Sequence, residues 1–213
     1  MSAILFDLDG VLIDSWEAVE SAFLAASTEL SVDGAARLGD FRARMGMPLE
    51  AIVDQFGFPQ AFPACFRHHA RAHDHKTRAF PGVAAMLHAI RQSARIGVVT
   101  GKDRPRTLML LESTGLARYV DAVVSASDAP GKPRPEGLWL CEQRLGAAAL
   151  AFIGDTAIDL LAAHNAGRTA VLASWGGGPP VSARPGVIEI AAPGDVVALL
   201  RALDGEPQRQ AAP

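Results

Sequence analysis

The chain has 213 residues, of which 49% are apolar and 20% are charged, and its formal net charge is −3. This length and composition fit one large globular domain, or one domain with a small insert. The net charge argues against a nucleic-acid-binding surface, and no apolar run approaches the ~18 residues of a membrane-spanning helix. We therefore expect neither a nucleic-acid partner nor a membrane partner.

The cysteines and the first residues indicate the compartment. Cys65 and Cys141 lack the spacing of metal ligands, so we interpret them as reduced thiols. Asp7 and Asp9 interrupt the first apolar stretch, which argues against a signal peptide. We expect a cytoplasmic protein that is a monomer or a homodimer.

The first predicted element is a buried strand over residues 3–6, and it is followed directly by Asp7, Asp9 and Gly10. Ligands of parallel α/β sheets bind where the strands end. Both aspartates point to the same side of an extended chain, and burying two like charges is costly unless a cation or a proton offsets them. The pattern predicts a functional site, the alternative being a strand end with two solvated carboxylates.

The segment from Ser15 to about Phe80 contains apolar residues at helical spacing and predicts about four helices. It follows the two aspartates immediately, so we expect it to lie over them as a lid. The predicted division is a core domain of residues 1–14 and 81–204, a helical cap of residues 15–80 and a flexible tail of residues 205–213.

After Pro81 the predicted elements alternate, which indicates an α/β fold with a Rossmann-like parallel sheet. We expect strands near residues 95–100, 121–125, 150–154 and 169–173, and helices near residues 82–93, 104–114, 135–145 and 156–166. Gly115, Gly146 and Gly167 stand where helices should end.

Three further motifs follow in order: Thr100-Gly101 after a strand, Lys132 in a Pro-rich loop, and Asp155 with Asp159 after another strand. With Asp7 and Asp9, they resemble the four-motif signature of the haloacid dehalogenase superfamily of phosphohydrolases, from about residue 3 to about residue 178. The position of the insert is similar to that of the helical-cap subfamily I, which includes phosphoglycolate phosphatase-like and β-phosphoglucomutase-like proteins.

The resemblance implies a Mg²⁺-dependent phosphatase. Asp7 would be the nucleophile that forms an aspartyl-phosphate, and Asp9 would act as general acid and base. Thr100 and Lys132 would hold the transferring phosphoryl group.

The same resemblance implies how the ion is held. Asp7, the backbone carbonyl of Asp9, and Asp155 would bind Mg²⁺. Asp159 would hold a metal-bound water or orient Lys132.

Substrate contacts are expected from Gly101, through its backbone amide, and from Lys102, for which a solvent-facing position is the alternative. The stretch Arg44-Met45-Gly46-Met47-Pro48 resembles a substrate-specificity loop, in which Arg44 would bind the leaving group; a solvated helix arginine is the alternative. Asp128 would either pair with Lys132 or cap a loop.

Other assignments fit the sequence less well. A dehalogenase would not need Asp9 and Asp155. A β-phosphoglucomutase-like protein carries a cap histidine that residues 17–21 lack. A non-catalytic binding protein remains a further alternative, although no motif residue is lost.

His69 and His73 are spaced like metal ligands, but they lack a matching third ligand, so we favour a solvated helix face.

The substrate is expected to be a small phosphorylated metabolite, either a phosphosugar or a phosphorylated carboxylic acid. The junction at Phe80-Pro81-Gly82-Val83, the Thr100-Gly101-Lys102 motif and the Trp175-Gly176 segment are similar to phosphatase-like proteins associated with 3-amino-5-hydroxybenzoate synthesis. The glycines after Trp175 form either a loop near the site or a flexible connection.

Overall fold

The computed structural model describes residues 1–45, 47–178, 180–182 and 185–205. Six of its strands form one sheet in the order β5-β4-β1-β6-β7-β8, and each neighbouring pair is parallel. These strands are β1 (Ser2–Phe6), β4 (Ala94–Val99), β5 (Ala122–Val124), β6 (Ala149–Gly154), β7 (Thr169–Ala173) and β8 (Ile188–Ile190). The predicted α/β fold with a parallel sheet is confirmed.

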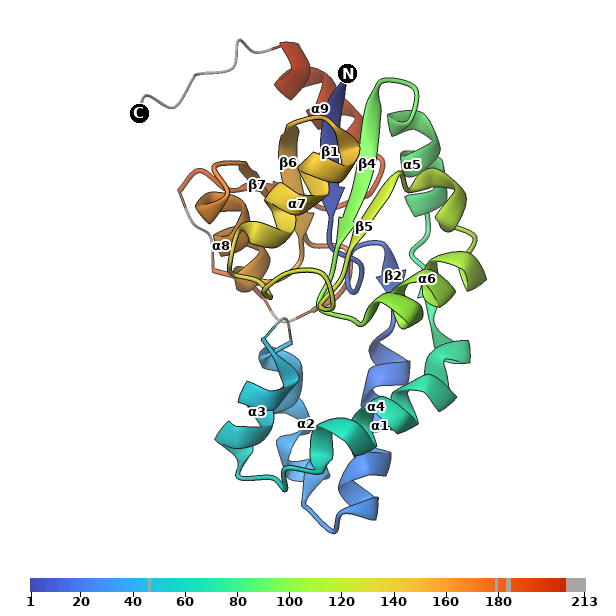
Figure 1. The fold of residues 1–213 in the computed structure, drawn as a ribbon, viewed down its shortest axis with the longest axis vertical. Coiled ribbons are helices and arrows are strands. Elements are labelled where there is room, and N and C mark those ends of the chain that lie inside the picture. The colour runs from blue at the N-terminus through green and yellow to red at the C-terminus, as the bar shows by residue number, and fades with distance from the viewer. Residues whose placement is uncertain (46, 179, 183–184, 206–213) are drawn as a thin grey trace.

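Helices cover both faces of the sheet (Figure 1). Along β1, Ile4 and Phe6 join one apolar core, and Ala3 and Leu5 join the other, because successive side chains of a strand point to opposite faces. Both faces of β1 are therefore buried, which fits its continuous apolar sequence. The covering helices are α5 (Val83–Ile90), α6 (Arg104–Ser113), α7 (Glu136–Leu145), α8 (Ala157–Asn165) and α9 (Asp195–Gly205).

A helical lobe lies beyond the carboxyl ends of the strands (Figure 1). The chain enters and leaves it through a two-stranded antiparallel ribbon of β2 (Ile13–Asp14) and β3 (Arg78–Ala79). The lobe contains α1 (Trp16–Glu29), α2 (Gly34–Ala43), α3 (Leu49–Phe56), α4 (Phe62–His73) and the 3₁₀ turn η1 (Asp74–Lys76). Its own apolar core includes stacked Phe23 and Phe41. The division into two domains stays a proposal.

The elements predicted between residues 82 and 173 are confirmed to within three residues at each end. Gly115, Gly146 and Gly167 have positive φ, as expected where helices end. The short 3₁₀ turn η2 (Ala117–Tyr119), β8 and α9 were not predicted. Residues 206–213 of the predicted tail lie outside the described residues. No helix among the described residues is long and apolar enough to cross a membrane.

Candidate active site

The loop after β1 brings Asp7 and Asp9 to the edge of the sheet that faces the helical lobe. The amide of Asp7 donates a hydrogen bond of 2.8 Å to the carbonyl of Ile153, which continues the pairing of β1 with β6. Gly10 then turns the chain with φ of +74° and donates to the carbonyl of Ile13 at 3.0 Å. The tight turn leaves the Asp7 carboxylate almost fully buried.

Gly10 also allows a close approach between segments far apart in the sequence. A Cβ at this position would lie 2.0 Å from Oδ2 of Asp155, and a Cβ on Gly176 would lie 2.3 Å from the carbonyl oxygen of Gly10. The indole of Trp175 donates to the carbonyl of Val11 at 2.9 Å. Of the two interpretations of the Trp175 segment, the structure therefore favours a loop packed against the site.

Lys132 lies between two carboxylates at the base of the site. Its Nζ atom is 2.9 Å from Oδ1 of Asp7 and 2.5 Å from Oδ1 of Asp159. Asp159 is itself fixed at the start of α8, where it forms a reciprocal capping box with Thr156. Burial opposes the charge of Lys132, but the nearby Asp159 and Asp7 outweigh it and raise the pKa of the lysine. Asp159 is thus placed to orient Lys132, which is one of its two expected roles and stays a prediction.

Three carboxylates converge beside this lysine. Oxygens of Asp7, Asp155 and Asp159 all lie within 4.8 Å of one another. Burial, followed by the charges of Asp159 and Asp7, holds the pKa of Asp155 well above its ordinary value. Burial also raises the pKa of Asp7, to about 7, although Lys132 acts in the opposite direction. If all three carboxylates are ionised, they carry more negative charge than the ammonium group of Lys132 can balance, and the raised pKa values reflect the cost of that state.

The donor set fits a hard divalent cation. Oδ1 of Asp155 is buried and has no hydrogen-bond partner among the described residues. An unpartnered buried carboxylate oxygen is costly, and a cation that prefers oxygen ligands would satisfy it. Asp7 and Asp155 were predicted as ligands, and the structure brings their carboxylates together. The carboxylate of Asp9 does not belong to this group, and the expected binding of the ion by the backbone carbonyl of Asp9 stays a prediction.

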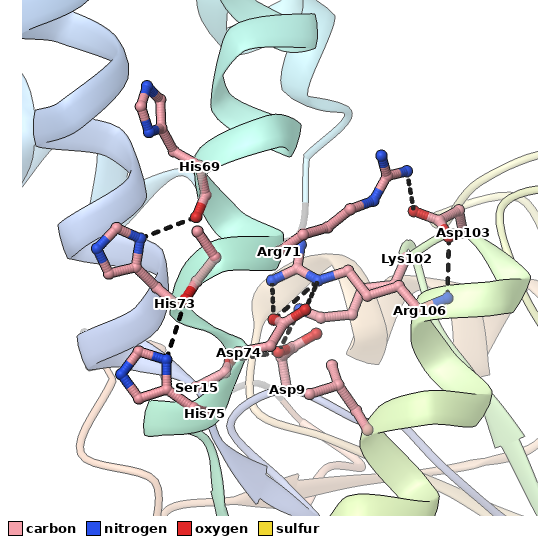
Figure 2. Close-up of polar contacts among 12 residues, drawn as sticks. Asp9, Ser15, His69, Arg71, His73, Asp74, His75, Lys102, Asp103 and Arg106 are labelled. Atoms are coloured by element: carbon pink, nitrogen blue, oxygen red, sulfur yellow. Dashed lines mark hydrogen bonds and ion pairs between the residues drawn. The ribbon is translucent and has the colours of Figure 1, made fainter.

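The Asp9 side chain faces a different set of partners (Figure 2). Its Oδ1 atom accepts from the hydroxyl of Ser15 and lies 2.6 Å from Nζ of Lys102. Burial acts to raise the pKa of Asp9, but Lys102 and Ser15 outweigh it and lower the pKa. Lys102 is therefore engaged with Asp9 and does not simply face solvent. Sequence reasoning missed Ser15, which carries no motif of its own.

Thr100 and Gly101 lie at the end of β4, on the same edge of the sheet. The amide of Thr100 donates to the carbonyl of Val124 at 2.9 Å, and its hydroxyl accepts from the amide of Lys102 at 3.3 Å. A Cβ on Gly101 would meet no atom within 4 Å, so open space surrounds this residue. The two residues are placed where a phosphoryl group beside Asp7 could reach them.

Among the described residues, two cavities between the sheet edge and the helical lobe are lined by predicted site residues. The first, which we call the Asp7 cavity, has a volume of about 360 Å³ and is lined by predicted site residues and by residues of the lobe. The predicted residues are Asp7, Asp9, Thr100, Gly101, Lys102 and Lys132. The second, the Asp155 cavity, measures about 400 Å³ and is lined by Asp155, Trp16, Arg42 and Arg44, among others.

Arg44 lies apart from the other predicted substrate residues. Its guanidinium donates to Oε1 of Gln55 at 3.2 Å and to the carbonyl of Asp40 at 3.0 Å, and it stacks over the ring of Phe56. It lines the Asp155 cavity but is not among the residues that line the Asp7 cavity. Gly46 of the predicted specificity loop lies outside the described residues. The substrate contact of Arg44 stays a prediction.

Asp128 serves the second of its two expected roles. Its carboxylate accepts from the amide of Ser125 at 2.9 Å and from Arg144 at 2.7 Å. The hydrogen bond from Arg144 is the main reason that the pKa of Asp128 is well below its ordinary value. The alternative of a pair with Lys132 is wrong, because that lysine contacts Asp7 and Asp159.

The ring nitrogens of His69 and His73 in α4 do not face a common metal position. Nδ1 of His73 contacts the carbonyl of His69 at 2.8 Å (Figure 2). Nε2 of His69 instead contacts Oε2 of Glu29 at 2.8 Å. Atoms of Glu29, Cys65 and His69 lie within 4.8 Å of one another. The pairing of His69 with His73 suggested by their spacing is therefore not formed.

A buried ion pair joins the lobe to the sheet domain. Arg106 of α6 makes three hydrogen bonds of 2.6–3.1 Å to the carboxylate of Asp74 in η1 (Figure 2). Both side chains are more than nine-tenths buried, and Arg106 also lines the Asp7 cavity. Sequence reasoning missed this pair because its partners are 32 residues apart and belong to no motif.

Comparison with known proteins identifies the family. The model of the haloacid dehalogenase-like hydrolases matches residues 4–173, which span all four motifs. This chain belongs to the haloacid dehalogenase superfamily of hydrolases. The predicted family and the enzyme class, a phosphatase, are confirmed.

Two relatives and one structure illustrate the likeness to other members of the superfamily. The probable phosphatase IndB of Dickeya dadantii is 36% identical over 188 residues, with 81% of each chain covered. The plasmid-encoded phosphoglycolate phosphatase of Cupriavidus necator is 32% identical, with 84% of each chain covered. A haloacid dehalogenase-like hydrolase from Streptococcus pneumoniae has the same fold, with a TM-score of 0.80, 24% identity and coverage of 94% of this chain and 98% of that one.

Proposed function

We propose that this superfamily member is a Mg²⁺-dependent phosphatase that hydrolyses a small-molecule phosphate monoester through an aspartyl-phosphate on Asp7. The observation that carries the proposal is the position of Lys132 between Asp7 and Asp159, beside the unpartnered carboxylate oxygen of Asp155. This arrangement offers a nucleophile, a fixed positive charge and a carboxylate that lacks a counter-charge, all within one buried edge of the sheet.

In the first step, Asp7 attacks phosphorus and the bond from phosphorus to the leaving oxygen breaks. Asp9 donates its proton to that oxygen, which leaves as an alcohol. In the second step, Asp9 takes a proton from a water molecule as the water attacks phosphorus, and the bond to Asp7 breaks. The products are the alcohol and inorganic phosphate, and both aspartates return to their starting states.

The positively charged side chains act on the phosphoryl oxygens. Lys132 is held by Asp159 and needs no rearrangement to face the charge that develops at phosphorus. Lys102, which contacts Asp9 in the structure, would turn toward the phosphoryl oxygens when substrate binds. Asp9 would then lose Lys102, the strongest of the groups that lower its pKa, and it would hold more readily the proton that the first step requires.

A magnesium ion bound by Asp7, Asp155 and the carbonyl of Asp9 would supply positive charge that lowers the repulsion between the phosphate and its nucleophile. Asp159 would keep its contact with Lys132 and so separate the lysine from the ion. We further propose a cytoplasmic location and a small phosphorylated metabolite as the substrate. Because residues 17–21 contain no histidine to exchange protons with a sugar hydroxyl, we favour a phosphatase over a phosphomutase.

The Asp7→Asn variant tests this proposal. The side chain is nearly unchanged in size, so we expect the protein to fold and turnover of phenyl phosphate to be abolished. Mass spectrometry must show that the asparagine has not deamidated. Hydrolysis above background by intact Asp7→Asn protein, purified free of other phosphatases, would exclude Asp7 as the nucleophile.

A further inference from the structure

The lobe side of the Asp7 cavity differs in chemistry from its sheet side. Most of the lobe residues that line it are apolar, including Val19, Phe41, Met45, Met47, Ile52 and Phe66. Among the described residues, the lobe contributes two charged side chains to this cavity, Glu50 of α3 and Arg67 of α4. A leaving group that extends from Asp7 toward the lobe therefore meets an apolar wall interrupted by one charged pair.

Glu50 and Arg67 form an ion pair with no net charge. Nη2 of Arg67 lies 2.5 Å from Oε1 of Glu50, and both side chains remain about half exposed, at 45% and 58%. An arginine has five N–H donors, so this contact leaves others for a ligand. The second oxygen of Glu50 can likewise accept a hydrogen bond.

A neutral pair of this kind favours a hydroxyl group over a carboxylate. A hydroxyl can accept from Arg67 and donate to Glu50 at the same time. A carboxylate can accept from Arg67, but it has no proton to donate and would be repelled by Glu50. The sheet side carries Lys102 and Lys132, which contact Asp9 and Asp7 in the structure and would face a phosphate bound beside Asp7.

The cavity volume also bears on the size of the leaving group. About 360 Å³ lies within the range of pockets that enclose ring-sized ligands. A two-carbon leaving group would leave much of the apolar wall in contact with water, whereas a ring would cover it.

We propose that Glu50 and Arg67 select phosphate monoesters whose leaving group is a ring-sized, largely apolar alcohol or phenol with an uncharged hydroxyl at its far end. This inference rests on the proposed phosphatase function and narrows its substrate class. It replaces the broader expectation of a phosphosugar or a phosphorylated carboxylic acid, and it places the selectivity on α3 and α4.

The experiment compares three esters that differ at one position: phenyl phosphate, 4-hydroxyphenyl phosphate and 4-carboxyphenyl phosphate. We expect wild-type kcat/KM to be highest for the hydroxyl ester and lowest for the carboxylate ester. Glu50→Gln leaves Arg67 with an unbalanced charge and should raise the carboxyphenyl-to-phenyl ratio of kcat/KM by about tenfold. Adding Arg67→Gln to that variant should remove the gain.

Asp40→Asn is the matched control. It removes a carboxylate of similar exposure, 52%, from the Arg44–Asp40 pair, which lies in the same lobe but does not line the Asp7 cavity. We expect this variant to keep the wild-type ratio within twofold. Circular dichroism and thermal unfolding of each variant show that the lobe remains folded.

Two results would overturn the assignment: a ratio that Glu50→Gln leaves unchanged, or an equal rise in Asp40→Asn. A wild-type preference for the carboxyphenyl ester over the hydroxyphenyl ester would do the same. If no ester releases phosphate, the proposed function fails instead. The affinities of the three esters for Asp7→Asn protein, measured by calorimetry, then test the selectivity separately, because binding to this variant requires no turnover.

Discussion

Substituting Gly10 with alanine should perturb the candidate metal site through a single methyl group. The new Cβ would lie 2.0 Å from Oδ2 and 2.5 Å from Cγ of Asp155, whereas real Cβ atoms essentially never approach closer than 3.0 Å. The Asp155 carboxylate must therefore move by about 1 Å or more, since the backbone around residue 10 is fixed by its pairing with Ile13.

The expected magnitude has two parts. A φ of +74° costs a residue with a Cβ atom about 1–2 kcal/mol, and crowding in a packed site costs a further ~1–3 kcal/mol. We expect the free energy of unfolding to fall by about 2–4 kcal/mol, because movement of Asp155 relieves part of the clash. A catalytic group misplaced by 1 Å can cost about 100-fold in rate, so kcat/KM should fall by about that factor.

Gly115→Ala is the matched control. Gly115 has almost the same φ, +73°, but a Cβ there would meet no atom within 4 Å. Chemical denaturation and phenyl phosphate hydrolysis across a Mg²⁺ titration are measured for both variants. We expect Gly115→Ala to show the backbone cost alone, with unchanged activity. If Gly10→Ala and Gly115→Ala lose equal stability, and Gly10→Ala keeps the wild-type Mg²⁺ requirement, the placement of Asp155 against this turn is refuted.

Two further substitutions test contacts on either side of the site. Arg44→Ala decides between the predicted substrate contact and packing inside the lobe. Because Asp40, Gln55 and Phe56 hold the guanidinium of Arg44, we expect the kcat/KM ratios among the three phenyl esters to change less than twofold. A loss of kcat/KM specific to one ester would instead support the substrate contact. Asp128→Asn should lower the free energy of unfolding at pH 7 by about 1–3 kcal/mol, since its hydrogen bonds involve charged partners. Because the pKa of Asp128 is lowered in the fold, its ionised carboxylate stabilises the protein above the ordinary aspartate range, and this contribution is lost as the pH falls toward the lowered value. The difference in free energy of unfolding between wild type and Asp128→Asn should therefore narrow on acidification. A difference that stays constant from pH 7 to pH 3 would contradict this prediction.

Much of the site could be predicted because its residues follow strands. A parallel sheet brings the ends of β1, β4 and β6 to one edge, so Asp7, Thr100 and Asp155 meet there whatever the details of packing. The alternating pattern of apolar segments was enough to locate these strands. The position of the lobe followed in the same way from the point at which the chain leaves β1.

The contacts that sequence did not predict depend on how helices pack. Arg44 follows α2 and Arg67 lies on α4, and the packing of the lobe helices determines which of the two lines the Asp7 cavity. The bond from Lys102 to Asp9 joins two loops, and the Arg106–Asp74 pair joins α6 to the end of the lobe. None of these contacts leaves a periodic pattern along the chain.

The end of the sheet was missed for a different reason. β8 has three residues, is paired on one side only and follows a segment rich in glycine and proline. A strand this short shows too little alternation to be recognised from sequence. α9 packs beside α5 and buries Val196 and Leu200 in the apolar core. The buried face of α9 is identified by these tertiary contacts and not by its sequence.

Trapping the phosphoryl group on the chain tests whether Asp7 receives it during turnover. The enzyme is quenched with acid during turnover of phenyl phosphate in the presence of Mg²⁺, digested, and its peptides are analysed by mass spectrometry. We predict a phosphoryl group on the peptide that contains Asp7, and its absence from the Asp7→Asn variant. Phosphate release at the wild-type rate with no phosphoryl group on Asp7, at any quench time within the first turnover, would contradict the mechanism.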